Sequence, residues 1–186
     1  MKDDSNRRFQ MVTIATCQTA FGWVAIAASE RGLVRVTLPV TTEAKARDLL
    51  MDLGYVHSDT QGLLDSVKRC LQAFYAGKPV DFDDVLLDPT VGTPFFRRVW
   101  AITRCIPRGQ TRTYGDLARE LGSPALARAV GRAMATNPWP PIVPCHRVVG
   151  SRGQLTGFGG GLRMKRRLLE MEGVSKFDED AVCMVS

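Results

Sequence analysis

The sequence predicts an α+β fold with two domains, an N-terminal α/β domain and a mostly helical C-terminal domain. Three β-rich runs separated by short turns occupy residues 11–38, whereas four helical patterns follow residue 92. Between them lies Asp88-Pro89-Thr90-Val91-Gly92, where the charge balance of the chain changes sign. The 186 residues, of which 45% are hydrophobic and 24% charged, are enough to bury two small cores. We therefore expect domains at residues 1–88 and 93–174 and a disordered tail at residues 175–186.

The N-terminal domain is expected to be a three-stranded antiparallel meander with two helices and one further short strand. Its first three segments are rich in Val, Ile, Ala and Thr and are separated by turns that contain glycine. Two later segments have apolar residues at helical spacing. The expected strands are residues 11–18, 22–29, 32–38 and 81–87, and the expected helices are residues 43–53 and 63–75. None of these segments carries recognisable chemistry, so a structural domain is predicted.

The C-terminal domain begins and ends with a predicted helix. Thr93 can cap a helix that has Pro94 in its first turn and ends near Ile106. A last helix is expected at residues 162–171, directly after Gly157-Phe158-Gly159-Gly160-Gly161. This glycine run is not a dinucleotide-binding fingerprint, because no βαβ unit surrounds it. It can instead let backbone N–H groups approach a ligand.

A helix-turn-helix is predicted between these two helices. Its helices are expected at residues 114–121 and 124–135, capped by Thr113 and Ser123, although ordinary helical hairpins share this spacing. The second helix is slim, because Ala or Gly occupies six of its positions, Ala125, Ala127, Ala129, Gly131, Ala133 and Ala135. Such a helix can approach a phosphate backbone closely or enter the narrow minor groove. The alternative is that it packs tightly within the domain.

The charge of the chain is unevenly distributed. The segment from Arg97 to Arg167 contains 14 Lys and Arg residues but only two acids, Asp116 and Glu120. The net charge of the whole chain is only +6. A segment so basic and so rich in Arg predicts a polyanion as partner. Nucleic acid is therefore favoured over a basic surface that serves solubility alone.

Other features restrict the class of protein. No apolar run reaches 18 residues and the N-terminus lacks the apolar core of a signal peptide, so the cytoplasm is predicted, or the nucleus in a eukaryote, with no membrane partner. The five cysteines include no CxxC pair, which favours reduced thiols. With two histidines and no clustered ligands, no metal site and no cofactor are expected.

The candidate reactive stretch is Pro144-Cys145-His146-Arg147-Val148-Val149, which we expect to be a strand. The thiolate is the reactive form of cysteine, and a neighbouring cation or general base raises its population. An isolated Cys-His dipeptide would more often be structural, because free cysteine is among the most buried residue types. The residues around the dipeptide therefore decide its interpretation.

Asn137-Pro138 followed by Pro144-Cys145-His146-Arg147-Val148-Val149 makes the chain resemble the O6-alkylguanine-DNA alkyltransferases, which are single-use DNA-repair proteins. The resemblance extends over essentially the whole chain and is strongest from Thr93 to Gly173. It implies a ribonuclease-H-like N-terminal domain and a winged-helix-like DNA-binding domain. It also implies double-stranded DNA containing O6-alkylguanine as the partner, no cofactor, and a monomer whose cooperativity on DNA stays open.

The resemblance implies roles for individual residues. Cys145 would accept the alkyl group, and His146, oriented by Glu172, would act through a water as its base. Asn137 would fix the turn that bears the site. The implied pocket for a flipped-out guanine consists of Tyr114, Met134, Val148, Phe158 and Gly159, where Phe158 replaces a tyrosine that is frequent in the family. The implied DNA-binding residues are Arg128, Ala127, Ala129, Gly131, Arg132, Ser151 and Arg147.

Three alternatives are weaker. Alkyltransferase-like proteins recognise alkylated guanine without transferring the alkyl group, but they lack the acceptor cysteine, and Cys145 is present. A helix-turn-helix regulator with a redox-sensing Cys145 would need base-reading side chains on its second helix, where Ala and Gly predominate. A thiol hydrolase would need a separate histidine or an oxyanion motif, and neither is evident in the sequence.

Overall fold

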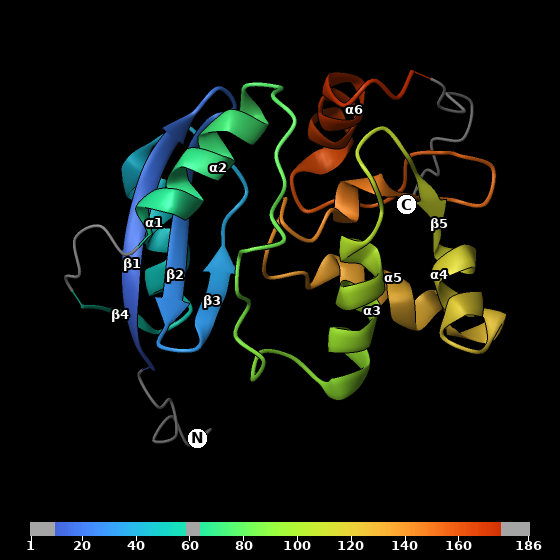
Figure 1. Cartoon of the computed structure of the whole chain (residues 1–186), viewed down its shortest axis with the longest axis horizontal. Helices are drawn as coiled ribbons and strands as arrows, with labels where there is room; N and C mark the ends of the chain where they lie inside the picture. The colour runs from blue at the N-terminus through green and yellow to red at the C-terminus, as the bar shows by residue number, and fades with distance from the viewer. Residues whose placement is uncertain (1–9, 59–63, 176–186) are drawn as a thin grey trace, which may run out of the picture. The chain divides into compact units, whose positions relative to one another are not determined.

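A computed structural model of the chain describes residues 10–58 and 64–175, and it divides the chain into two compact units, residues 1–90 and 91–186 (Figure 1). The division falls inside the predicted boundary segment, residues 88–92. Of the tail expected at residues 175–186, all but the first residue lies outside the described part of the chain. The helices and strands give an α+β fold, as predicted. None of the helices in the described part is long and apolar enough to cross a membrane.

Unit 1 contains the predicted antiparallel meander. β1 (Gln10–Thr19) pairs with β2 (Gly22–Ser29), and β2 pairs with β3 (Gly32–Val36). The sheet has a further strand that the sequence did not predict, β4 (Tyr55–Ser58), which runs parallel to β1 and gives the order β3-β2-β1-β4. β4 is short and pairs with a strand far earlier in the chain, so no local pattern marks it.

The strand expected at residues 81–87 does not form. The side chain of Asp81 accepts a hydrogen bond from the Asp83 N–H at 2.7 Å, which turns the backbone instead of extending it. The segment joins β3 through an isolated bridge between Leu33 and Leu87. The prediction of this strand was wrong because side-chain hydrogen bonds to the backbone compete with a strand ladder.

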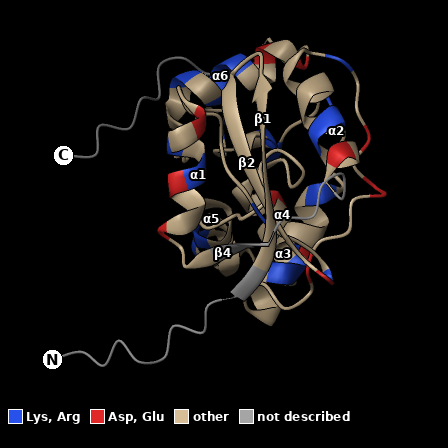
Figure 2. Ribbon diagram, turned by 90° about the vertical axis from the view of Figure 1, so that its left-hand side faces the viewer, with Lys and Arg blue, Asp and Glu red and all other residues tan. Residues whose placement is uncertain are grey.

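Two helices cover the sheet of unit 1 on opposite faces. In Figures 1 and 2, α1 (Glu43–Met51) and α2 (Asp65–Tyr75) lie on either side of the strands. Thr42 caps α1, because its hydroxyl accepts a hydrogen bond from the Lys45 N–H. Since helices cover both faces, the central strand β2 is buried at every position from 24 to 28.

Unit 2 is mostly helical, and its first helices begin where the capping residues predict. α3 (Pro94–Arg104) follows Thr93, whose hydroxyl accepts a backbone hydrogen bond from the first turn. α4 (Tyr114–Glu120) starts with a capping box, in which Thr113 and Asp116 each bond the other's backbone N–H. Both starts are thus stabilised by residues three positions apart.

The second helix of the helix-turn-helix begins with a single 3-10 turn. This turn, η1 (Pro124–Leu126), follows Ser123, whose side chain accepts a hydrogen bond from the Ala125 N–H. It continues directly into α5 (Ala127–Ala135). The last helix of the unit is α6 (Gly161–Met171).

The reactive stretch is not the strand that we expected. Its first residues form a single 3-10 turn, η2 (Cys145–Arg147), closed by a hydrogen bond of 2.9 Å from the Arg147 N–H to the Pro144 carbonyl. The two residues after it form β6 (Val148–Val149), which pairs in parallel with β5 (Arg112–Thr113). Neighbouring side chains on this turn diverge because the backbone coils, not because strand residues alternate between faces.

Trp100 joins α3 to α5 in the core of unit 2. Its indole N–H donates a hydrogen bond of 2.8 Å to the Ala133 carbonyl. Its ring meets that of Trp139 edge to face, with ring centroids 5.2 Å apart, and both tryptophans are buried. This packing holds α5 and the segment leading to the reactive turn in one core.

Candidate functional site

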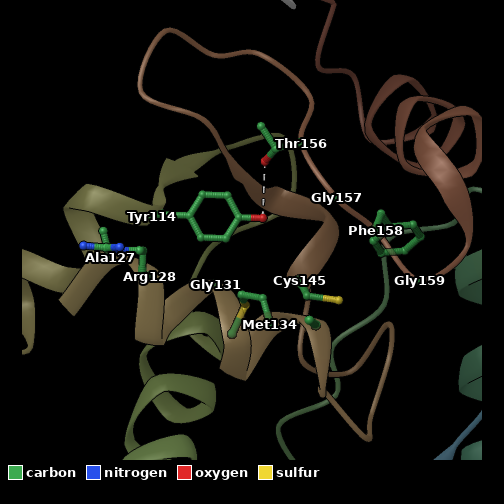
Figure 3. Close-up of a pocket in the computed structure, with 11 residues that line it drawn as sticks. Tyr114, Ala127, Arg128, Gly131, Met134, Cys145, Thr156, Gly157, Phe158 and Gly159 are labelled. Carbon is green, nitrogen blue, oxygen red and sulfur yellow. Dashed lines mark hydrogen bonds between the residues drawn. The ribbon is translucent and has the colours of Figure 1, made fainter. Parts of the chain in front are cut away.

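A cavity of about 680 Å³ lies in unit 2 beside Cys145 (Figure 3). Its walls come from the start of α4, one side of α5, η2 and the loop before α6. The lining residues are Tyr114, Ala127, Arg128, Gly131, Met134, Ala135, Cys145, Thr156, Gly157, Phe158 and Gly159. The predicted pocket residues line this cavity with the exception of Val148, whose side chain is fully buried. Ala135, Thr156 and Gly157 also line it and were not predicted.

The small residues of α5 leave room for an aromatic ring. A methyl group at Gly131 would lie 3.9 Å from the ring of Tyr114, which is ordinary contact distance. The Tyr114 hydroxyl accepts a hydrogen bond of 3.4 Å from the Thr156 hydroxyl (Figure 3). Burial raises the pKa of Tyr114 above its ordinary value, so the phenol keeps its proton and can donate it in a hydrogen bond.

Cys145 is held by an amide. The Asn137 Nδ2 donates to the Cys145 Sγ at 3.2 Å and to the Val143 carbonyl at 2.8 Å, while the Asn137 Oδ1 accepts the Trp139 N–H at 3.0 Å. Burial raises the pKa of Cys145, although the Asn137 bond and the ammonium of Lys165 partly oppose this. The sulfur is therefore a thiol at rest, and its reaction needs a base.

His146 and Glu172 form a buried pair behind the cysteine. The His146 Nε2 and the Glu172 Oε1 are 3.1 Å apart, and the two side chains are 1% and 0% exposed. Burial of the ring lowers the pKa of His146, against the raising effect of Glu172. Burial alone would raise the pKa of Glu172, but hydrogen bonds from His146 and Arg147 outweigh it and hold that pKa at about 2. The arrangement is therefore a neutral imidazole beside an ionised carboxylate.

Arg147 does not project toward solvent, as a DNA-binding residue would. Its Nε donates to the Glu172 Oε2 and its Nη2 to the Glu172 Oε1, both at 2.8 Å. Its Nη1 donates to the Ile106 carbonyl at 2.5 Å, and the side chain is only 12% exposed. The guanidinium of Arg147 is thus bound to the buried carboxylate of Glu172, and its role in DNA binding stays a prediction.

Lys165 is a site residue that the sequence analysis missed. It is fully buried, and its Nζ donates to the carbonyls of Val148 at 2.6 Å and of Thr156 at 2.9 Å. Burial lowers its pKa to about 8. The sequence includes it only as one of the 14 basic residues between Arg97 and Arg167. A signal was present, because Lys165 has Leu168, Leu169 and Glu172 three, four and seven positions later, on one helix face.

The other residues predicted to bind DNA remain accessible. Arg128, Arg132 and Ser151 are exposed, and Arg128 lies at the cavity. Ala127, Ala129 and Gly131 are half-buried on α5.

Within the described residues, no group of three or more His, Cys, Asp and Glu side chains is placed to hold a metal ion.

Comparison with known proteins gives consistent matches. Residues 94–174 match the family model described as 6-O-methylguanine DNA methyltransferase, DNA binding domain. The chain is 53% identical over 102 residues to the methylated-DNA--protein-cysteine methyltransferase of Mycobacterium tuberculosis (strain ATCC 25618 / H37Rv). This match covers 55% of this chain and 61% of that protein. It is 50% identical over 105 residues to the protein of the same name from Methanosarcina acetivorans, and this match covers 56% of this chain and 66% of that protein. The matched part thus spans less than two thirds of these curated relatives.

Solved structures match over more of the chain. The crystal structure of Mycobacterium tuberculosis O6-methylguanine methyltransferase has a TM-score of 0.71 and 38% identity, and the match covers 90% of this chain and 97% of that one. The structure described as Mycobacterium tuberculosis OGT in complex with DNA has a TM-score of 0.69 and 35% identity, and the match covers 87% of this chain and 93% of that one.

Proposed function

We propose that this chain, which belongs to the 6-O-methylguanine DNA methyltransferase family, repairs O6-alkylguanine in double-stranded DNA by transferring the alkyl group to Cys145. The observation that carries the proposal is that Cys145 lines the cavity while its neighbour His146 is paired with Glu172 at 3.1 Å. A nucleophile, a base and a group that orients the base thus occupy one small region.

The ionised Glu172 determines which nitrogen of His146 can act as a base. A carboxylate only accepts hydrogen bonds, so the neutral imidazole donates from Nε2 and keeps its lone pair on Nδ1. We propose that Nδ1 removes the thiol proton of Cys145 through a water. The S–C bond then forms as the C–O6 bond breaks, and a proton returns to the guanine. The products are an unmodified guanine and a neutral thioether, so each molecule acts once.

A guanine inside a duplex cannot reach a buried sulfur, so the nucleotide has to leave the base stack, at a cost of a few kcal/mol. We propose that α5 enters the minor groove, because its small residues let it approach closely. Arg128 would fill the place that the base vacates, and Arg132 and Ser151 would contact the backbone together with Ala127, Ala129 and Gly131. The exposure of the polar members supports this assignment.

The cavity would hold the flipped base. Met134 and Phe158 would form its walls, and the neutral Tyr114 would donate a hydrogen bond to the ring. The carbonyls of Cys145 and Val148 would accept hydrogen bonds from the exocyclic amine, and the Gly159 N–H would donate to O6. Gly159 is exposed, so its backbone can be approached without obstruction by a side chain.

We further propose that residues 1–88 form a structural, ribonuclease-H-like domain and that residues 93–174 form the winged-helix-like domain for DNA binding and transfer. The sheet order β3-β2-β1-β4 with a parallel β4 supports the first assignment. The family match over residues 94–174 supports the second.

The test is to incubate the protein with duplex DNA that contains one O6-methylguanine and to measure the mass of the peptide containing Cys145. One methyl group per protein molecule is expected. Cys145→Ser should abolish transfer, whereas Cys105→Ser, which changes an exposed thiol of the same unit, should retain it. More than one equivalent per molecule, or undiminished transfer by Cys145→Ser, contradicts the proposal. Binding of the lesion without transfer would instead identify a non-enzymatic recognition protein.

A further inference from the structure

Arg147 and Glu172 form a two-point ion pair inside unit 2. Two parallel hydrogen bonds of 2.8 Å join the guanidinium to both carboxylate oxygens. The side chain of Glu172 has no exposed surface. Pairs of this planar, charge-assisted kind are the strong ones, and they hold the positive charge directly against the carboxylate.

One carboxylate oxygen of this pair serves two donors. The Glu172 Oε1 accepts from the Arg147 Nη2 at 2.8 Å and from the His146 Nε2 at 3.1 Å. The guanidinium remains charged at any physiological pH, whereas the imidazole can be neutral or cationic. The negative charge of Glu172 is therefore balanced by Arg147 without His146 having to become a cation.

Among the described residues, the charged groups that act on the pKa of His146 come from η2 and from α6 with its C-terminal end. Cys145 and Arg147 belong to η2, whereas Lys165 and Glu172 belong to the α6 segment. Burial of the ring disfavours the imidazolium, Glu172 favours it, and the cations Arg147 and Lys165 disfavour it again, so that the pKa of His146 is lowered. Arg147 acts both directly on the ring and through the carboxylate that the ring contacts.

We propose that Arg147 is a positioning residue of the site, whose charge, held against Glu172 by the two-point pair, keeps His146 neutral and able to accept the thiol proton at Nδ1. The assignment rests on the proposed function for the proton transfer, but the protonation state of His146 can be measured without DNA. A cationic His146 cannot accept a proton. Loss of Arg147 is therefore expected to slow the activation of Cys145, and to do so most at low pH.

The direct test is an NMR titration of the imidazole signals. The chain has two histidines, so a His57→Gln background assigns the remaining signals to His146. His146 should be neutral at pH 6.5 and protonated on Nε2. Arg147→Gln should shift its titration to higher pH, and Arg147→Lys, which keeps the charge, should largely restore the original titration. Arg163→Gln removes an exposed arginine from α6 and serves as the matched control, which should titrate like the unchanged protein.

The rate of alkyl transfer from free O6-methylguanine base gives a second measurement that does not involve DNA contacts. Arg147→Gln is expected to lower this rate about tenfold more at pH 6 than at pH 8.5, because each pH unit below the pKa of a base costs about tenfold in the active form. A purely structural defect would lower the rate equally at both pH values. Equal losses would therefore overturn the proposal.

Two outcomes of the NMR titration would contradict the role of Arg147. An unchanged titration of His146 in folded Arg147→Gln would overturn the proposal, as would an equal upward shift in Arg147→Lys. If Arg147→Gln does not fold, Arg147→Met, which also removes the charge, takes its place in the titration. A cationic His146 at pH 6.5 in the unsubstituted protein also contradicts the proposal. Absence of transfer by the unsubstituted protein would count against the proposed function alone, since the titration does not depend on it.

Discussion

The Lys165 Nζ donates a hydrogen bond of 2.6 Å to the Val148 carbonyl, although Lys165 has no exposed surface. A second hydrogen bond, of 2.9 Å, reaches the Thr156 carbonyl in the loop that lines the cavity. One buried ammonium thus ties that loop to the strand that follows the reactive turn. Burial lowers the pKa of this ammonium from 10.5 to about 8, which has a measurable consequence.

Lys165 should make the stability of the protein depend on pH. Its folded pKa of about 8 lies below the unfolded value, so between about pH 8 and 10.5 the unfolded chain binds more protons, and the free energy of unfolding rises with pH. Relative to Lys165→Met, the unsubstituted protein should gain roughly 3 kcal/mol across this window. Urea unfolding of both proteins from pH 7 to 11 measures the difference. Two parallel curves would contradict the prediction.

Arg128 should matter for duplex DNA and little for the isolated base. Its side chain is exposed at the cavity, where it can replace an extruded nucleotide. Because extrusion costs a few kcal/mol, Arg128→Ala is expected to slow transfer from duplex DNA by about tenfold to a hundredfold. Transfer from free O6-methylguanine should change far less. Single-turnover rates on both substrates test this, with Arg163→Ala as an exposed control, and equal losses on both would remove the assigned role.

Binding to duplex DNA should weaken steeply with salt. Each phosphate contact that releases a counterion contributes about −0.9 to the slope of log K against log salt concentration. Arg132 is exposed on α5, so Arg132→Ala should reduce the magnitude of this slope by about 1. Ser151→Ala removes an exposed hydroxyl without changing the charge and should leave the slope unaltered. Fluorescence anisotropy between 50 and 300 mM salt measures all three slopes, and a flat dependence would contradict a basic DNA-binding face.

Trp100→Phe should destabilise unit 2 through a lost hydrogen bond. The indole N–H donates to the Ala133 carbonyl at 2.8 Å, and its removal leaves that carbonyl with only the longer bond of 3.4 Å from the Thr136 hydroxyl, at a cost of about 1 kcal/mol. Trp23→Phe is a comparison in unit 1, because the half-buried Trp23 makes no indole hydrogen bond to any described residue. Thermal unfolding of both variants checks the prediction, and equal effects would show that ring packing alone matters.

Helix starts in this chain are predictable because capping is local. Thr93, Thr113 and Ser123 each bond a backbone N–H two or three positions later, so the sequence alone marks where α3, α4 and η1 begin. β4 is different, because its partner is the distant strand β1 and its few residues carry no strong pattern. The turn at Cys145 was also missed, because the apolar residues around it are typical of a strand.

The candidate site shows the same division between local and distant causes. Cys145, Tyr114 and Met134 line one cavity as the resemblance implied. The inward orientation of Arg147 was not predicted, because its partner Glu172 lies on an element that only the folded chain brings near. The helix face of Lys165 did indicate burial, but its carbonyl partners are likewise distant in the sequence. A basic residue in a basic segment is predicted to be on the surface until a buried carboxylate or carbonyl is known to face it.

Trp139 is separated from the reactive sulfur by one amide side chain. Its backbone N–H donates to the Asn137 Oδ1 at 3.0 Å, and the Asn137 Nδ2 donates to the Cys145 Sγ at 3.2 Å. The Trp139 ring in turn lies edge-on against Trp100, with centroids 5.2 Å apart. Indole emission responds to its surroundings, and the backbone of one of these two packed indoles is one hydrogen-bonded side chain away from the sulfur. We therefore expect alkylation of the sulfur to change the intrinsic indole emission, so that the proposed transfer could be followed in real time without an added dye.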